Sequence, residues 1–172
     1  MRLFHVSEQS DIHHFEPRIP DRNDLDKHVG LVWAIDEFHL PNFLTPRNCP
    51  RVTYHIGENT TDVDRMNFFS TDTMTYAIVI ENKWFHIVRS TTLYLYEFHT
   101  EDFVLQDHVA GYYVAKTKQI PIAKYEFRDL FSELIKRNVE IRVVDNLWNI
   151  ADKVKASTLN YSLCRMAFAQ PR

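Results

Sequence analysis

A histidine and a serine near the start of the chain, His5 and Ser7, are the first residues whose types could do chemistry. They lie in an apolar segment, Leu3 to Ser7, that is typical of a strand, and alternate side chains of a strand share a face. An imidazole and a hydroxyl on one face can hydrogen-bond a ribose or orient another polar ligand. The alternative is a histidine that only completes the hydrogen bonding of a sheet face, with Ser7 or a backbone group as its partner.

Early in the chain, three arginines each follow a proline directly; they are Arg18, Arg47 and Arg51. Proline restricts the backbone, and arginine binds phosphate or carboxylate through two parallel hydrogen bonds. The chain has only three glycines and neither G-x-G-x-x-G nor G-x-x-x-x-G-K-[ST]. A bound phosphate would therefore depend on these arginine side chains rather than on a glycine-rich loop. Ordinary salt bridges of loop arginines are the alternative.

Two glutamates in strand-like segments are candidate catalytic carboxylates. Glu140 lies in Val139-Glu140-Ile141-Arg142-Val143, where it shares a face with Arg142. A carboxylate in a cleft can hydrogen-bond a ribose hydroxyl and stabilise a developing positive charge. A surface ion pair with Arg142 is the alternative. Glu97, in the alternating segment 93–98, is the second candidate, and the residues leave open which of the two carboxylates is relevant.

The other residues offer few further kinds of chemistry. Trp33 lies in the apolar run 31–35, which predicts a buried strand, so it is either a core residue or a platform for a stacked ring. Neither H-E-x-x-H nor a cluster of cysteine and histidine occurs, and we expect no metal. A serine nucleophile in G-x-S-x-G is absent as well, and Cys49 is a lone thiol.

Composition describes a globular protein of one domain, residues 1–172. The hydrophobic fraction is 45%, the charged fraction 25% and the net charge −3, which argues against a nucleic-acid partner. No apolar run approaches a membrane span, the beginning of the chain does not resemble a signal peptide, and two cysteines make no disulfide framework. We therefore expect a cytoplasmic protein without a membrane partner. Its oligomeric state stays open.

Hydrophobic periodicity predicts seven or eight strands and three or four helices without regular βαβ alternation. This pattern favours an α+β fold with a largely antiparallel sheet, in one piece or split into two. Residues 61–69 are expected to form a helix with Val63, Met66 and Phe69 inward. Residues 127–135 and 147–154 show helical spacing as well. The polar residues 19–30 predict a surface loop, either a lid or a plain connection.

Four short segments together resemble the ADP-ribosyltransferase-like enzymes, which often combine an L-[YF]-H-x-[ST] strand, a polar turn with proline, a V-[YW]-A-[ST] strand and a late E-[VI]-x-V strand. The corresponding segments here are Leu3-Phe4-His5-Val6-Ser7, Phe15-Glu16-Pro17-Arg18, Val32-Trp33-Ala34-Ile35, in which Ile35 replaces the small residue, and Glu140-Ile141-Arg142-Val143. The chain is also similar to uncharacterised bacterial single-domain proteins, which implies a bacterial origin.

The resemblance implies a nucleotide-processing transferase that acts on NAD, as its substrate, or on an ADP-ribose-like group. It assigns the nicotinamide-side ribose to His5, stacking on nicotinamide to Trp33, and the polarised 2′-hydroxyl and charge stabilisation to Glu140. A related branch, the RNA 2′-phosphotransferase-like proteins, relies more on arginines, a role that Arg18, Arg47 and Arg51 would suit. A domain that binds a small ligand without catalysis is the alternative function.

Overall fold

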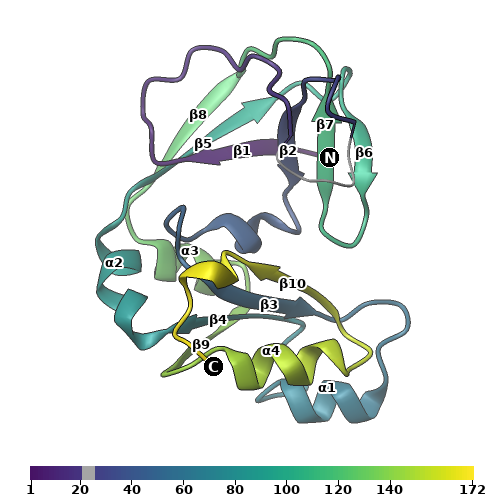
Figure 1. Ribbon diagram of the computed structural model, residues 1–172, viewed down its shortest axis with the longest axis vertical. Helices are drawn as coiled ribbons and strands as arrows, with labels where there is room; N and C mark the ends of the chain where they lie inside the picture. The colour runs from purple at the N-terminus through teal and green to yellow at the C-terminus, as the bar shows by residue number, and fades with distance from the viewer. Residues whose placement is uncertain (21–25) are drawn as a thin grey trace. The chain divides into compact units, whose positions relative to one another are not determined.

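The structure is a computed structural model that describes residues 1–20 and 26–172, and these residues form two compact units (Figure 1). The first unit comprises residues 1–40 and 93–127, and the second comprises residues 41–92 and 128–172. Each unit combines two separate segments of the chain. The expectation of a single domain over 1–172 stays a prediction. Residues 21–25, in the middle of the expected loop 19–30, lie outside the described part, so the lid hypothesis has no structural account.

The first unit is a six-stranded, fully antiparallel sheet. Its strand order is β6-β7-β2-β1-β5-β8. The strands are β1 (Leu3–Ser7), β2 (Val32–Asp36), β5 (Leu93–Phe98), β6 (Val104–Asp107), β7 (Tyr112–Ala115) and β8 (Ala123–Phe127). One face carries a core of Leu3, Val32, Ala34, Tyr96, Phe98, Phe103 and Ala115, against which Phe15 packs from the segment that follows β1.

The second unit is a four-stranded sheet of order β10-β3-β4-β9, in which only the β4–β9 pair is parallel. Its strands are β3 (Arg51–His55), β4 (Tyr76–Glu81), β9 (Val139–Val144) and β10 (Asn160–Cys164). The helices are α1 (Asp62–Phe68), α2 (Phe85–Ser90), α3 (Leu130–Lys136) and α4 (Trp148–Lys155), and 3-10 turns are η1 (Leu40–Phe43), η2 (Asn82–Trp84) and η3 (Met166–Phe168). Figure 1 shows α1 and α4 along one face of this sheet.

The predicted α+β class is confirmed, and of the two arrangements left open, the largely antiparallel sheet is split into two. The spacing of apolar residues places the helices correctly where it is strongest. In α4, Ala151 and Val154 are fully buried together with Leu147, which precedes the helix. In α3, Leu130 and Leu134 are buried and Asp129 caps the first turn through its side chain. These helices bury a stripe, as amphipathic helices of globular proteins do.

The predicted inward face of the first helix is wrong for Val63 and Met66 and right for Phe69. Val63 and Met66 are 61% and 73% exposed, whereas Phe68 and Phe69, at the end of α1, enter the core. The helix has only seven residues and is capped by Thr61, so its last turn alone reaches the apolar cluster. The spacing of 127–135 also predicts Ile135 on the buried side of α3, but it is 66% exposed, because only Leu130 and Leu134 form the buried stripe and Ile135, five positions after Leu130, lies off it.

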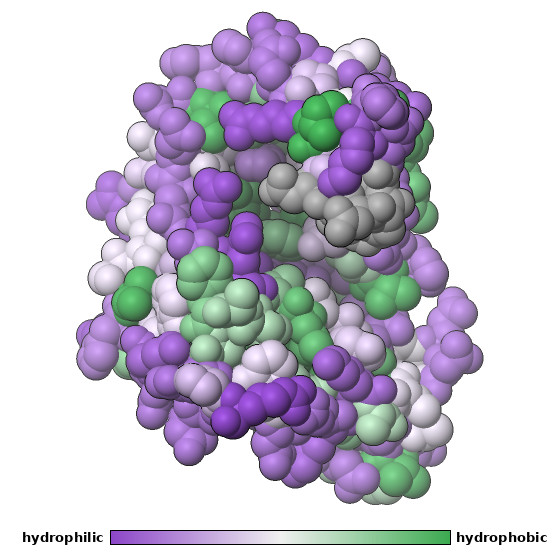
Figure 2. All heavy atoms as spheres, viewed as in Figure 1, coloured by the Kyte–Doolittle hydropathy of each residue, from purple (hydrophilic) through white to green (hydrophobic). Residues whose placement is uncertain are grey.

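One strand boundary and one edge strand differ from expectation. The sequence predicts a last strand over residues 161–168, but the observed strand ends at Cys164, because Arg165 adopts a left-handed backbone (φ 55°) and the turn η3 follows. Strand β6 was not predicted, since three of its four residues are exposed and it shows no alternation of buried positions. Among the described residues, no helix is both long and apolar enough to cross a membrane. Hydrophilic side chains prevail on the face drawn in Figure 2.

Candidate functional site

His5 is held firmly on β1. Its Nδ1 lies 3.0 Å from the carbonyl oxygen of Trp33, and its ring lies 4.7 Å from the ring of Phe15. Because a carbonyl oxygen only accepts, the proton of the neutral imidazole must be on Nδ1, and Nε2 carries the lone pair. The backbone of β2 therefore sets the tautomer of His5. Ser7, on the same face, uses its hydroxyl oxygen to accept the N–H of Gln9 at 3.1 Å.

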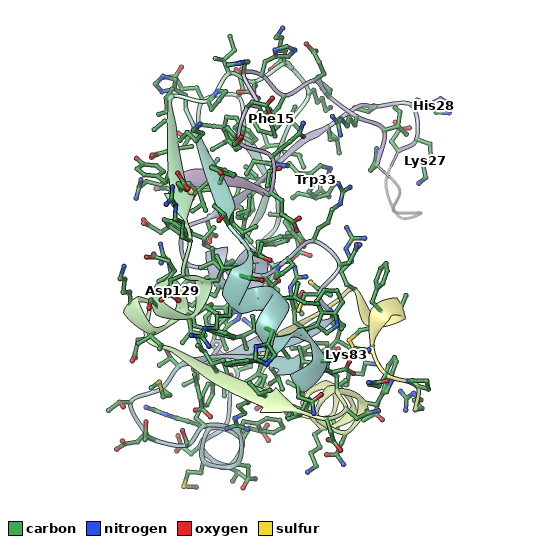
Figure 3. The ribbon with its side chains drawn as sticks, turned by 90° about the vertical axis from the view of Figure 1, so that its left-hand side faces the viewer. Phe15, Lys27, His28, Trp33, Lys83 and Asp129 are labelled. Carbon is green, nitrogen blue, oxygen red and sulfur yellow. The ribbon has the colours of Figure 1, made fainter. Side chains whose placement is uncertain are left out.

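Trp33 presents its indole on the other face of the first sheet. Phe4 pairs with Ile35, so the alternation of side chains places Trp33 with Phe4 and places His5 with the core face. The indole makes an edge contact with Tyr112, at 5.5 Å between ring centroids. Figure 3 labels Trp33 and also Phe15, whose ring contacts that of His5. A small ligand on one face of this sheet therefore meets either the imidazole or the indole.

The three arginines differ in their surroundings. Arg18 is exposed, and its backbone forms an isolated bridge with Leu31 through hydrogen bonds of 3.1 and 2.9 Å. Arg47 is exposed as well, in the segment between η1 and β3. Arg51, at the start of β3, is only 4% exposed, and its guanidinium donates to the carbonyl oxygens of Asn42 (2.7 Å) and Cys49 (2.9 Å).

Glu140, on β9, accepts hydrogen bonds from Arg142 of the same strand and from Ser70, which follows α1. Its Oε2 accepts the backbone N–H of Ser70 at 3.0 Å, and its Oε1 lies 2.6 Å from Nε of Arg142. Arg142 also donates to the carbonyl oxygen of Phe68. Burial opposes the ionisation of Glu140, but the Ser70 N–H and the Arg142 guanidinium outweigh it and lower the pKa of the carboxyl. The carboxylate is thus ionised and tied to the loop that follows α1.

Glu97, the second candidate carboxylate, lies on β5 and forms a bidentate pair with Arg2, at 2.8 and 2.9 Å. The hydroxyl of Tyr125 donates to the same carboxylate at 2.8 Å. These hydrogen bonds, that of Arg2 first, outweigh burial and lower the pKa of Glu97. Both carboxylates are therefore engaged by arginine. Glu97 belongs to the first unit with His5, Ser7, Arg18 and Trp33, whereas Glu140 belongs to the second with Arg47 and Arg51.

The structure also reveals a partly buried acid–histidine pair that was not predicted from the sequence. Nδ1 of His39 lies 2.8 and 3.0 Å from the two carboxylate oxygens of Asp36, and the backbone N–H of His39 donates to Asp36 at 2.8 Å. Burial raises the pKa of Asp36, but the hydrogen bonds of His39 outweigh it, so the pKa is lowered. The i, i+3 spacing directly after a buried strand was the available signal.

No metal centre accompanies these groups: within residues 1–20 and 26–172, no three His, Cys, Asp or Glu side chains are arranged to hold an ion. Cys49 is fully buried, and burial raises the pKa of its thiol to about 12. A thiol with such a pKa stays protonated at neutral pH and is a poor nucleophile.

Comparison with known proteins places the chain in a family. One family model matches residues 4–169, which is nearly the whole chain and includes both units. The chain belongs to the DUF6886 family. DUF6886 is described as a family of unknown function. No curated protein and no solved structure matched. The chemistry of this DUF6886 protein must therefore be argued from its own side chains.

The surroundings of Glu140 lead to a stability prediction. Glu140→Gln should lower the free energy of unfolding at pH 7 by about 1–2 kcal/mol, because the hydrogen bonds to an ionised acceptor are weakened. The lowered pKa means that the native contribution is present above the ordinary value of 4.5 and is lost as the pH falls through the lower native pKa. Urea unfolding at pH 7 and at pH 3 should show the difference between variant and wild type shrinking in acid. An equal difference at both pH values would contradict this assignment.

Proposed function

We propose that this DUF6886 protein is a bacterial cytoplasmic enzyme of the ADP-ribosyltransferase-like kind that acts on NAD or an ADP-ribose-like group. The single observation that carries the proposal is the fixed tautomer of His5, whose Nδ1–H donates to the carbonyl oxygen of Trp33. With Nδ1 as the donor, Nε2 is the acceptor nitrogen of the neutral imidazole, and such a nitrogen can accept a hydrogen bond from a ribose hydroxyl. The two-sheet α+β architecture and the resemblance of the four segments support the same function.

The chemistry expected of such an enzyme is a transfer at the ribose carbon that carries nicotinamide. The bond to nicotinamide breaks with its electron pair going to the nicotinamide nitrogen, and a nucleophilic atom of the acceptor bonds to the same carbon. A carboxylate stabilises the positive charge that develops in between. The resemblance assigns this role to Glu140, which is ionised at neutral pH since its pKa is lowered.

Calorimetric titration of the whole chain with NAD tests binding. We expect saturable heat at millimolar NAD or below, and about a five- to tenfold weaker affinity for His5→Ala, the usual consequence of losing one hydrogen bond. His13→Ala is the matched control, because His13 is an exposed histidine of the same unit. Absence of binding to the folded wild type at millimolar NAD would remove the proposal, and equal weakening by both variants would remove His5 from it.

A non-enzymatic domain that binds a small ligand is the second candidate, and one observation favours it. Glu97 and Glu140 are both held by arginine, at 2.8 Å and 2.6 Å, so each carboxylate already has a structural partner. The release of nicotinamide, followed by chromatography, distinguishes the candidates. An enzyme should release nicotinamide from NAD, and Glu140→Gln should slow the release at least a hundredfold while NAD still binds. Binding without release would favour the second candidate.

A further inference from the structure

Arg51 is a buried cation without an acidic partner among the described residues. Its side chain is 4% exposed, and in the part of the chain that the structure describes no carboxylate lies within ion-pair distance of it. Its guanidinium donates to two backbone carbonyls and lies 5.5 Å from the ring of Phe43. Glu81, the buried acid of β4, is paired with Lys83 at 3.2 Å. Removing a full charge from water is costly unless an opposite charge compensates it, so Arg51 indicates a place for an anion.

The strand that begins with Arg51 has one polar face. Arg51, Thr53 and His55 alternate along β3 and are all buried, whereas Val52 and Tyr54 point into the apolar core on the other face. Strand β10 continues the polar face. Its residues Asn160, Ser162 and Cys164 lie opposite His55, Thr53 and Arg51, respectively. Charged and polar groups thus cover three consecutive rungs of one sheet face.

Hydroxyl groups beside Arg51 are only weakly satisfied. The hydroxyl of Thr53 lies 3.5 Å from the carbonyl oxygen of Ser162, at the limit of a hydrogen bond. The hydroxyl of Ser162 contacts the sulfur of Cys164 at 3.3 Å, and sulfur is a weak partner. In the segment that Arg51 ties down, the hydroxyl of Thr45 is buried and has no hydrogen-bond partner among the described residues. Donors in this condition gain by binding an anion.

We propose that this polar face, defined by Arg51, Thr53 and Ser162, binds the phosphate group of a small phosphorylated metabolite. Positions i and i+2 of a strand are about 7 Å apart, and directly opposite side chains about 5 Å, so three such side chains can surround one phosphate. The guanidinium supplies the opposite charge, and the two hydroxyls donate to phosphate oxygens. The oxygens of a tetrahedral phosphate can accept from donors on two rungs of the sheet at once. A carboxylate is planar and has only two oxygens. The site needs only the second unit and goes beyond the proposed action on NAD.

Thermal unfolding of the whole chain with added phosphate tests the site, with sodium chloride used to hold the ionic strength constant. A ligand that binds only the folded state stabilises it in a saturable way. We expect inorganic phosphate to raise the melting temperature saturably, and Ser162→Ala to weaken the apparent affinity at least threefold. Ser10→Ala is the matched control, since Ser10 is an exposed serine of the first unit. Arg51→Met should abolish the effect, and Ser162→Ala keeps the test valid if that variant does not fold.

A second arm uses adenosine monophosphate, a phosphate monoester, to identify the source of the phosphate. A larger shift than with inorganic phosphate supports a phosphorylated metabolite, and a shift with inorganic phosphate alone overturns that part of the proposal. No shift beyond the chloride control, or an equal affinity in wild type and Ser162→Ala, overturns the site. The phosphate shift should persist in His5→Ala, so failure of NAD binding and failure of this site are distinguishable.

Discussion

Gly111→Ala is expected to lower the free energy of unfolding by about 3 kcal/mol. Gly111 has a positive φ of 69°, a conformation that side chains with a Cβ rarely adopt. A Cβ built on it would lie 2.1 Å from Nδ1 of His39. His39 cannot easily yield, because the same nitrogen is hydrogen-bonded to both oxygens of Asp36. Backbone strain and steric overlap therefore add.

Urea unfolding measures this effect, and Gly30→Ala is the matched control. A Cβ at Gly30 would lie 3.0–3.1 Å from Pro17, and its φ is not in the left-handed region, so its cost should be clearly smaller. The double variant Gly111→Ala/His39→Ala should separate the two contributions. It removes the overlap and keeps the backbone strain, so the added cost of the alanine at 111 should fall to about 1 kcal/mol in that background. A loss below 1 kcal/mol for Gly111→Ala itself would show that the Asp36–His39 pair yields readily.

Glu81→Ala is expected to cost about 3 kcal/mol and to release the end of the chain. Glu81 is fully buried, and its two carboxylate oxygens accept the backbone N–H of Gln170 at 2.9 and 3.1 Å. Lys83, labelled in Figure 3, pairs with this carboxylate and also donates to the carbonyl oxygen of Phe168. Removing the carboxylate leaves the N–H of Gln170 without its acceptor and deprives the ammonium group of its counter-charge.

Other contacts hold the same C-terminal segment, so its release should be local rather than complete. The indole N–H of Trp148 donates to the carbonyl oxygen of Gln170 at 2.8 Å, and Arg172 pairs with Asp152 at 2.9 and 3.1 Å. Faster digestion by a carboxypeptidase, together with urea unfolding, would report both effects. Glu81→Gln keeps one acceptor oxygen and should cost about half as much. Glu101→Ala, at an exposed position, is the control and should change neither.

Strands with a strong apolar signal could be predicted from the sequence almost to their ends. The continuous apolar run 74–80 and the alternating segment 139–144 predict strands, which are observed as β4 (Tyr76–Glu81) and β9 (Val139–Val144). An exposed edge such as β6 carries no such signal, because its pairing with β7 depends on the backbone rather than on buried side chains. The inward side of α1 is predicted correctly only at Phe69, because only the end of this helix, at Phe68 and Phe69, reaches the apolar cluster.

Residue type and spacing single out candidate site residues in the sequence, but they do not predict the surroundings of these residues. Strand alternation correctly placed His5 and Ser7 on one face. The position of Trp33 on the opposite face depends on the pairing of Phe4 with Ile35, and a shift of one residue would have reversed it. Similarly, the R-V-T-Y-H pattern of β3 contains the alternation that makes one face polar, but its burial depends on packing.

The sequence by itself therefore determined the α+β class, most strands, the absence of glycine-rich phosphate loops, and the residues whose types could bind a nucleotide. Only the tertiary structure decided which of them have partners. Arg2 meets Glu97 across 95 positions of the chain, and Ser70 donates to Glu140 across 70. Local periodicity depends on neighbours in the chain, whereas ion pairs and buried charges depend on strand register and packing. For that reason the sequence shows Arg51 as one arginine among several, and the fold distinguishes it as a buried cation.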